Sequence, residues 1–196
     1  MKIVLALASY LLGSLPTGYL LMRMTDRRDI RELGSQSTGA TNVLRVMGLR
    51  FAFPVLVVDV LKGFAPAFLA MRLFRSPALA VLCAFLATAG HCFPFAIGFR
   101  GGKGMATSMG AYAALAFRPF LACLAVFVLV VAVSRFVSLG SILGSLAFPP
   151  FVLLTRGPRV LFFGSLAIAA LVVLRHKDNI GRLWAGTERR LGARAS

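Results

Sequence analysis

Long hydrophobic runs, separated by short polar clusters, account for most of the chain. A helix needs about 20 consecutive apolar residues to cross the hydrocarbon core of a bilayer, and most of these runs approach that length. Seven of them can be recognised, at about residues 3–22, 51–71, 78–98, 104–117, 119–134, 141–155 and 159–174. We therefore predict an all-α integral membrane protein, a bundle of about seven transmembrane helices.

The first run, at 3–22, would form about 30 Å of helix, which is enough to cross a membrane. It lacks the small-residue cleavage site of a secretory signal peptide, so we expect it to be retained as a transmembrane helix. Since no low-complexity linker interrupts the chain, residues 1–196 are predicted to form one membrane-embedded domain.

The segment 104–134 decides how many times the chain crosses. A single helix would bury Arg118 near its middle and would place Ser138 and Ser141 on the side opposite the other polar clusters. Two helices, with a turn at Arg118-Pro119 on the outer surface, put every polar cluster on one side. We favour two, although 104–117 gives only about 21 Å of helix and would have to tilt. A five-span protein is the alternative.

Charge sets the expected orientation. The chain has 22 Lys and Arg residues, six acidic residues and a formal net charge of +16, and 59% of its residues are hydrophobic. The basic residues are scattered among apolar spans, which argues against nucleic-acid binding. They are dense in the loop 23–50 and in the tail beyond 174, up to Arg194. By the positive-inside rule, the motif loops and the C-terminus should be cytoplasmic and the N-terminus outside.

Acidic and cysteine side chains are scarce. No Asp or Glu lies between residues 60 and 177, so a mechanism that needs paired carboxylates has few candidates. Cys83, Cys92 and Cys123 lie in apolar stretches without CxxC spacing, which indicates buried thiols and no metal site.

The cluster Gly101-Gly102-Lys103-Gly104 follows a long apolar run. Glycines let backbone N–H groups approach an anion, and the lysine adds a positive charge, so the cluster is typical of a phosphate cradle. It is not the nucleotide P-loop, which needs glycine at Ile97 and a hydroxyl residue at Gly104. A tight cytoplasmic turn whose lysine fixes the topology is the alternative.

A second cluster spans residues 35–42 and ends one helical turn before Arg45. It combines four hydroxyl residues, two amides and a glycine, among them Ser35, Thr41 and Asn42. Such a stretch can bind phosphate through backbone amides, hydroxyls and a forked cation. The alternative is that Ser and Thr cap a helix that begins near Asn42.

Two further groups have both structural and functional interpretations. Asp59 and Lys62 share one helix face within a span, where they can neutralise each other. An ion pair inside the membrane suggests function by default, but we favour a structural tie that supports a neighbouring loop over catalysis. His91, near the end of the third span, is interpreted as a hydrogen-bonded interhelical histidine.

The remaining polar residues lie after the fifth and the last spans. Of Ser138 and Ser141, three residues apart, one would cap a helix and the other face a ligand. His176 and Asn179 open the tail with a spacing that directs imidazole and amide at one ligand, or caps a helix.

The order of these clusters is more specific than any one of them. The chain contains GSLPTGYL at 13–20, GSQSTGATNVLR at 34–45, DVLKG at 59–63, GHCFPF at 90–95, GFRGGKGMATS at 98–108, SLGSI at 138–142 and HKDNIGRLWAGTE at 176–188. Together these runs resemble the acyl-phosphate-dependent glycerol-3-phosphate acyltransferase (PlsY) family over nearly the whole chain. The positions that match its motifs are Ser35, Thr41, Asn42, Arg45, Gly101, Gly102, Lys103, Gly104, Ser141, His176, Asn179 and Glu188. Where the family usually has Gly-Asn after the first serine, this chain has Gln36-Ser37.

The resemblance implies transfer of a fatty acyl group from acyl phosphate to the 1-hydroxyl of glycerol 3-phosphate. The products would be 1-acylglycerol 3-phosphate and phosphate, in an early step of phospholipid synthesis at the bacterial inner membrane, with no cofactor or metal. Because acyl phosphate is already activated, we expect direct attack by the hydroxyl without a covalent enzyme intermediate. No nucleophilic triad is visible in the sequence.

Three roles would be filled by these residues: phosphate binding, substrate positioning and proton acceptance. Lys103 and Arg45 would neutralise phosphate charge, and the backbones of 101–104 and 35–42 would cradle phosphate. Ser141, His176 and Asn179 would position the substrates. The proton would pass to a substrate phosphate oxygen, with His176 as the competing base.

A transporter or flippase for a phosphorylated metabolite or lipid is the alternative function. Its site should lie near the bilayer midplane between repeated halves of the sequence. The polar clusters of this chain gather at one face and no internal repeat is visible, which favours the enzyme.

Overall fold

A computed structural model describes residues 1–192, and Arg194, the last of the tail's basic residues, lies outside this range. Within it the chain is helical and has no strand, which confirms the predicted all-α class. The α-helices are α1 (Lys2–Gly13), α2 (Thr17–Asp26), α3 (Ala40–Met47), α4 (Leu49–Phe74), α5 (Pro77–Cys92), α6 (Met105–Leu115), α7 (Phe117–Ser134), α8 (Val137–Leu154), α9 (Arg159–Arg175) and α10 (Lys177–Trp184). Two short 3₁₀ helices, η1 (Ile30–Glu32) and η2 (Phe95–Ile97), lie in the loops.

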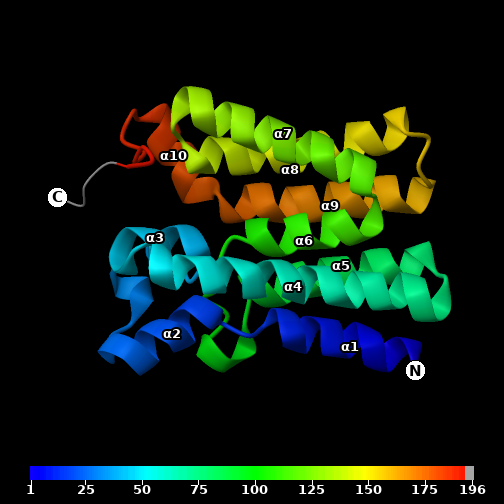
Figure 1. The fold of residues 1–196 in the computed structure, drawn as a ribbon, viewed down its shortest axis with the longest axis horizontal. Coiled ribbons are helices and arrows are strands. Elements are labelled where there is room, and N and C mark those ends of the chain that lie inside the picture. Colours follow the sequence, from blue (N-terminus) through cyan, green and yellow to red (C-terminus); the bar gives the residue numbers. More distant parts are fainter. Residues whose placement is uncertain (193–196) are drawn as a thin grey trace.

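The long helices lie side by side along the longest axis of the molecule, and α7, α8 and α9 follow one another in alternating directions (Figure 1). One end, on the left in the figure, gathers α3, α10, the start of α6 and the turn between α7 and α8. The start of α1 lies at the other end. All the predicted polar loops are therefore brought to one end of the bundle, as the two-helix interpretation of 104–134 required.

The segment 104–134 is not one helix. The backbone of Ala116 is extended, with φ −156° and ψ 103°, and the chain reverses there between α6 and α7 (Figure 1). The break falls just before the predicted turn, and Arg118 lies exposed in the first turn of α7. The single-helix interpretation of this segment is therefore wrong, but a total of five spans is not excluded by this break.

The count of seven spans is not confirmed. Within residues 1–192, four helices are long and apolar enough to cross a membrane alone: α4, α5 continued to Ile97, α7 and α8. The pairs α1–α2 and α9–α10, bent by 40° and 59°, raise the number to six if each pair is one span. The predicted span that is missing from this count is 104–117. Its helix, α6, has 11 residues and gives about 16 Å of helix, half the thickness of a hydrocarbon core.

Small residues let the N-terminal helices pack closely. A Cβ at Gly13 would lie 2.1 Å from the carbonyl oxygen of Ala87, so only glycine allows α1 to approach α5 this closely. Gly13 is therefore a helix-packing position. Many large apolar side chains face outward instead, such as Val133, which is 80% exposed, as expected where lipid is the surrounding solvent.

Local sequence signals also place the loops. Ser76 caps α5 by accepting from the N–H of Leu79 at 3.3 Å, and Pro77 occupies the first turn, where its missing N–H costs nothing. At the other end of α5 the chain turns through η2 into the glycine cluster, which then opens α6.

Candidate functional site

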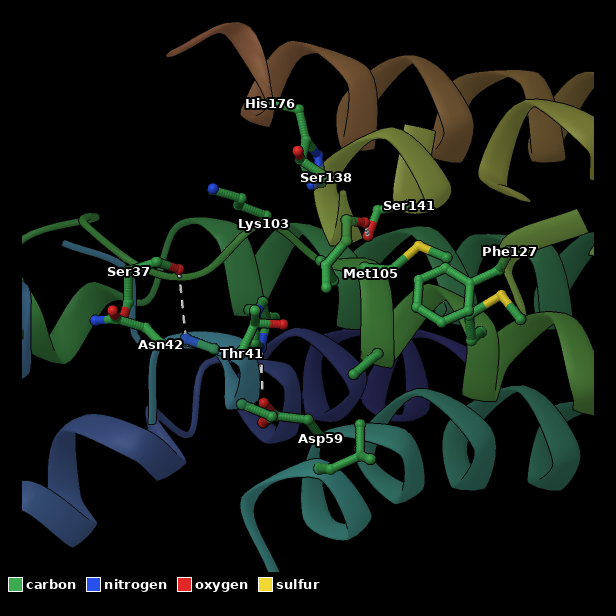
Figure 2. A pocket seen from close by; sticks show the side chains of 18 of the residues that line it. Ser37, Thr41, Asn42, Asp59, Lys103, Met105, Phe127, Ser138, Ser141 and His176 are labelled. Atoms are coloured by element: carbon green, nitrogen blue, oxygen red, sulfur yellow. Dashed lines mark hydrogen bonds and ion pairs between the residues drawn. The ribbon is translucent and has the colours of Figure 1, made fainter. Parts of the chain in front are cut away.

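A cavity of about 360 Å³ opens at the end of the bundle where the polar loops gather. In Figure 2, Lys103, Ser138, Ser141 and His176 lie on one side of this space and Thr41 and Asp59 on the other. An apolar part continues from this polar part and is lined by side chains of α6 and α7. Its members are Met105, Met109, Phe120, Leu124 and Phe127.

Most of the predicted site residues meet in this cavity, although they come from five separate parts of the chain. The residues that line it are Ser35, Thr41, Asn42, Arg45, Lys103, Gly104, Ser141, His176, Asn179 and Glu188. Gly101 lines a neighbouring cavity, and Gly102 lines neither of the two.

Lys103 extends from the loop before α6 to the tail. Its ammonium donates to the amide oxygen of Asn179, and Asn179 in turn donates from Nδ2 to Glu188 Oε1 at 2.7 Å. Burial lowers the pKa of Lys103 to about 8, the nearby charge of Arg182 acts in the same direction, and Glu188 opposes it. The lysine is therefore mostly charged at neutral pH and keeps donors available to an anion.

Glu188 organises the tail around this lysine. Besides Asn179, Ser138 donates to its Oε1 at 2.8 Å and Arg182 donates to its Oε2 at 2.7 Å. Burial raises the pKa of this carboxyl, but the three donors outweigh burial and leave it below its usual value. Glu188 is thus an ionised anchor, with its acceptor positions occupied by protein.

His176 lies in the one-residue break between α9 and α10, beyond the apolar span of α9. Its Nδ1 lies 2.7 Å from the carbonyl oxygen of Val172, so Nδ1 carries the proton and Nε2 is left as an acceptor. Burial is the main cause that lowers its pKa to about 4, and the positive charge of Lys103 adds to it. The imidazole is therefore neutral at neutral pH.

Asn42 shapes the first loop from inside. Its Oδ1 accepts from the N–H of Ser35 at 2.7 Å, and its Nδ2 lies within 3.2 Å of the carbonyl oxygens of Ile30, Leu33 and Ser37. With these partners and 1% exposure, both ends of its amide are engaged within the loop. In this structure Asn42 supports the loop, and its contact with substrate stays a prediction.

The alternative prediction, that Ser and Thr cap the helix after this loop, is wrong. The helix α3 begins at Ala40, and its N-cap residue, Gly39, supplies no side-chain bond. Thr41 and Arg45 lie on α3 and face the cavity instead. Burial lowers the pKa of Arg45, although a guanidinium remains charged, so a cation stays available at this side.

The glycine cluster is held by its own backbone. Gly101 donates its N–H to Cys92 O at 3.2 Å and Gly102 donates to His91 O at 3.0 Å. Arg175 donates to both glycine carbonyls, at 3.3 and 3.2 Å. These two amides are therefore engaged with the end of α5 and do not cradle phosphate in this structure. The same bonds present Lys103 to the cavity.

The two serines of the third loop do not cap a helix as expected. Ser138 is bound to Glu188, and Ser141 donates to Val137 O at 2.8 Å within α8. The N-cap residue of α8 is Phe136, which supplies no side-chain bond. Both hydroxyls line the cavity and keep lone pairs for a ligand.

At Gln36-Ser37, where the chain departs from the family pattern, the backbone conformation is unusual. Gln36 has φ 56°, in the left-handed region that favours glycine. A residue with a Cβ thus occupies a strained backbone conformation at the position where the family usually has glycine. Gln36 also lines the neighbouring cavity.

That neighbouring cavity, of about 250 Å³, is more polar and shares Ser35, Ser37 and Lys103 with the first. Four basic side chains and one acidic side chain line it: Lys103, Arg175, Lys177, Arg182 and Asp178. Both cavities thus border Lys103 and offer an excess of positive charge to an anion.

Sequence reasoning missed two kinds of lining residue. For Asp59 and His91 the sequence favoured structural roles, yet both line the larger cavity. The apolar wall was missed because the sequence shows that these positions are hydrophobic, not which of them face a cavity. The order of α6 and α7 around the tight turn at Ala116 is what brings them there.

These features define a class of protein: a helical membrane protein with a basic, polar cavity that continues into an apolar pocket, a combination suited to ligands that carry both an anionic group and an apolar chain. The comparisons identify the class more closely. Residues 3–186 match the family model described as glycerol-3-phosphate acyltransferase. The chain belongs to this family, the PlsY acyltransferases, as its motifs predicted.

Relatives of similar length support the assignment. A glycerol-3-phosphate acyltransferase of Synechococcus sp. (strain CC9902) is 41% identical over 97% of this chain and 96% of its own. That of Geobacter sulfurreducens is 40% identical over 98% of each. A crystal structure of PlsY, an integral membrane glycerol 3-phosphate acyltransferase, in its glycerol 3-phosphate form has a TM-score of 0.94 and 34% identity, covering 97% of this chain and 96% of that one. Its lysophosphatidic acid form has a TM-score of 0.90.

Proposed function

We propose that this protein transfers a fatty acyl group from acyl phosphate to the 1-hydroxyl of glycerol 3-phosphate, at the bacterial inner membrane and from the cytoplasmic side. The products are 1-acylglycerol 3-phosphate (lysophosphatidic acid) and phosphate. The observation that carries this proposal is the continuity of the polar part of the cavity, around Lys103, with the apolar part formed by α6 and α7. One substrate carries a phosphate and a tail and the other a phosphate alone, and this site offers both environments.

The reaction is a direct displacement at the acyl carbonyl. The glycerol hydroxyl oxygen forms a bond to the carbonyl carbon, the bond from that carbon to the phosphate oxygen breaks, and phosphate leaves. Because the leaving group is already good, the enzyme accelerates the reaction mainly by holding the substrates together and stabilising charge. The polar groups around Lys103 stabilise the negative charge of the phosphates, and the apolar pocket holds the acyl chain.

The residues divide into binding and supporting groups. Lys103 and Arg45 bind phosphate charge from opposite sides, and the hydroxyls of Ser35, Thr41 and Ser141 add neutral contacts. The supporting group comprises Asn42, Gly101, Gly102 and Glu188, whose hydrogen-bonding groups are already used within the protein. Asn179 belongs to both groups, since it orients Lys103 while lining the cavity.

The proton of the attacking hydroxyl passes to a phosphate oxygen of a substrate. Two observations support this over a histidine base. The Nδ1 of His176 is occupied by Val172 O, and a pKa of about 4 makes its Nε2 a weak proton acceptor. His176 then holds a substrate through an accepted hydrogen bond.

The test is a reconstituted reaction of purified protein with acyl phosphate and glycerol 3-phosphate. We expect phosphate release that depends on glycerol 3-phosphate and matches lysophosphatidic acid formed one to one. Acyl-CoA in place of acyl phosphate is the matched donor control. Transfer from acyl-CoA but not from acyl phosphate would contradict the proposed donor, and phosphate release without an acylated product would contradict the transfer itself.

A further inference from the structure

Two charged side chains that the proposed phosphate contacts do not use lie deep within α4. Asp59 is 1% exposed and Lys62 is 2% exposed, and Lys62 Nζ lies 2.9 Å from Asp59 Oδ1. The predicted ion pair is thus present. Lys62 also donates to Leu15 O at 2.9 Å, and Thr17 donates to Asp59 Oδ1 at 3.2 Å. The carboxylate is therefore fixed from two helices at the break between α1 and α2.

The carboxylate has a third neighbour, the imidazole of His91 on α5. His91 Nδ1 lies 3.7 Å from Asp59 Oδ1, and both residues line the larger cavity. This distance is too long for a hydrogen bond, so the carboxylate acts on the ring through its charge. A negative charge beside Nδ1 favours the tautomer that carries the proton on Nδ1 and favours the ring orientation that turns this edge toward Asp59. Asp59 Oδ2 has no protein hydrogen-bond partner among the described residues, so the contacts with Lys62 and Thr17 leave one carboxylate oxygen free to accept.

The opposite edge of the same ring supports the glycine loop. A Cβ added at Gly102 would lie 2.0 Å from His91 Nε2, so the imidazole is in direct contact with the backbone of Gly102. The carbonyl of His91 accepts the N–H of Gly102 at 3.0 Å. His91 therefore contacts Gly102 through both its side chain and its main chain. Lys103 directly follows Gly102 in the chain.

We propose that Asp59 and His91 form a positioning pair for Lys103. The buried carboxylate orients the imidazole, the imidazole sets the position of Gly102, and Gly102 sets where the lysine enters the cavity. Arg175 holds the other side of the same peptide through its two bonds to the glycine carbonyls. Because a charge-assisted contact with phosphate depends on donor geometry, a small shift of this loop weakens it. This role goes beyond an interhelical tie.

A double-mutant cycle tests this proposal, which rests on the proposed function because it uses acyl transfer as its readout. His91→Asn keeps a donor near the Nδ1 position but removes the ring edge against Gly102, whereas His91→Gln keeps a polar group near Nε2. We expect His91→Asn to lower kcat/KM about tenfold, mainly through KM, and His91→Gln to restore part of it. In a Lys103→Ala background, His91→Asn should change kcat/KM less than twofold, because its route of action is already removed.

Ser165→Ala is the matched control, since Ser165 is a fully buried polar residue on α9 whose hydroxyl bonds Phe162 O. It should leave the KM values unchanged in both backgrounds. Equal effects of His91→Asn with and without Lys103 would overturn the positioning role, as would an unchanged KM or a His91→Gln variant no better than His91→Asn. If His91→Asn does not fold, the double-mutant cycle is measured with His91→Gln and Lys103→Ala instead. Absence of transfer by the wild-type protein would instead refute the proposed function.

Discussion

Asn179 donates to Glu188 Oε1 at 2.7 Å, and this bond turns the amide oxygen of Asn179 toward Lys103. Lys103 is thereby oriented by a neutral group. No carboxylate among residues 1–192 forms an ion pair with it, in contrast to the Lys62–Asp59 pair deeper in the bundle. A lysine that is held in place but not neutralised by a carboxylate is suited to bind a substrate anion.

Lys103→Ala should therefore impair transfer strongly. The loss of one charge-assisted phosphate contact in a partly dry site removes about 1.5–3 kcal/mol, or roughly 10- to 150-fold in kcat/KM. Steady-state kinetics at low substrate would measure this, with Lys2→Ala, an exposed lysine at the other end of the bundle, as the control. An activity within twofold of the wild type would refute the phosphate-binding role of Lys103.

The same lysine predicts a pH dependence on the alkaline side. With a pKa of about 8, Lys103 is charged below pH 8 and loses its charge as the pH rises through 8. The KM for the phosphate-bearing substrate that it binds should rise about fivefold between pH 8 and pH 9. Lys103→Arg should abolish this rise, because a guanidinium stays charged above pH 12. A rise of equal size in Lys103→Arg would assign the titration to another group.

The sequence predicted the helices and the end of the bundle at which the site lies, for a physical reason. Apolar runs report which segments are buried in lipid, and polar clusters between them must gather where water begins. Lys103 and Asn179 were predicted as site residues from their local clusters and from the match to the family's motifs. The structure brings them into contact across 76 positions, because both follow spans that end on the same side. Side-chain direction could not be predicted this way. Asn42 turns into its own loop, and the amides of Gly101 and Gly102 bind the end of α5, because local carbonyls compete for the same donors.

Gln36→Gly should stabilise the protein. The left-handed conformation of Gln36 costs about 1–2 kcal/mol in a residue with a Cβ, and glycine relieves this cost at the expense of about 0.5–1 kcal/mol of unfolded-chain entropy. We expect a net gain of up to about 1 kcal/mol in the free energy of unfolding. Gln36→Ala, which retains the Cβ, is the control and should give no comparable gain in thermal unfolding. Equal stability of the two variants would refute strain at this position.

The orientation in the membrane can be tested at exposed positions. Single cysteines at Gln36 and Arg190, at the site end of the bundle, should react with a membrane-impermeant reagent only from the cytoplasm. A cysteine at Arg118 should react only from outside, because the chain reverses at Ala116. The three native cysteines are buried, which keeps the background low. Labelling of position 118 from the cytoplasm would reverse or refute the proposed topology.

The last prediction concerns His176 and the proton. A base with its ordinary pKa of about 6.5 would give the maximal rate an acid-side inflection near that pH. The imidazole in this site has a pKa of about 4, so it is neutral at pH 5 and above and should produce no inflection near 6.5. If its Nε2 holds a substrate by hydrogen bonding, His176→Asn should raise the KM for glycerol 3-phosphate and keep a measurable maximal rate. The pH dependence of the maximal rate in both proteins is the measurement. An inflection near pH 6.5 in the wild type, lost in the variant together with nearly all turnover at saturating substrates, would make His176 the base and exclude proton transfer to the substrate phosphate.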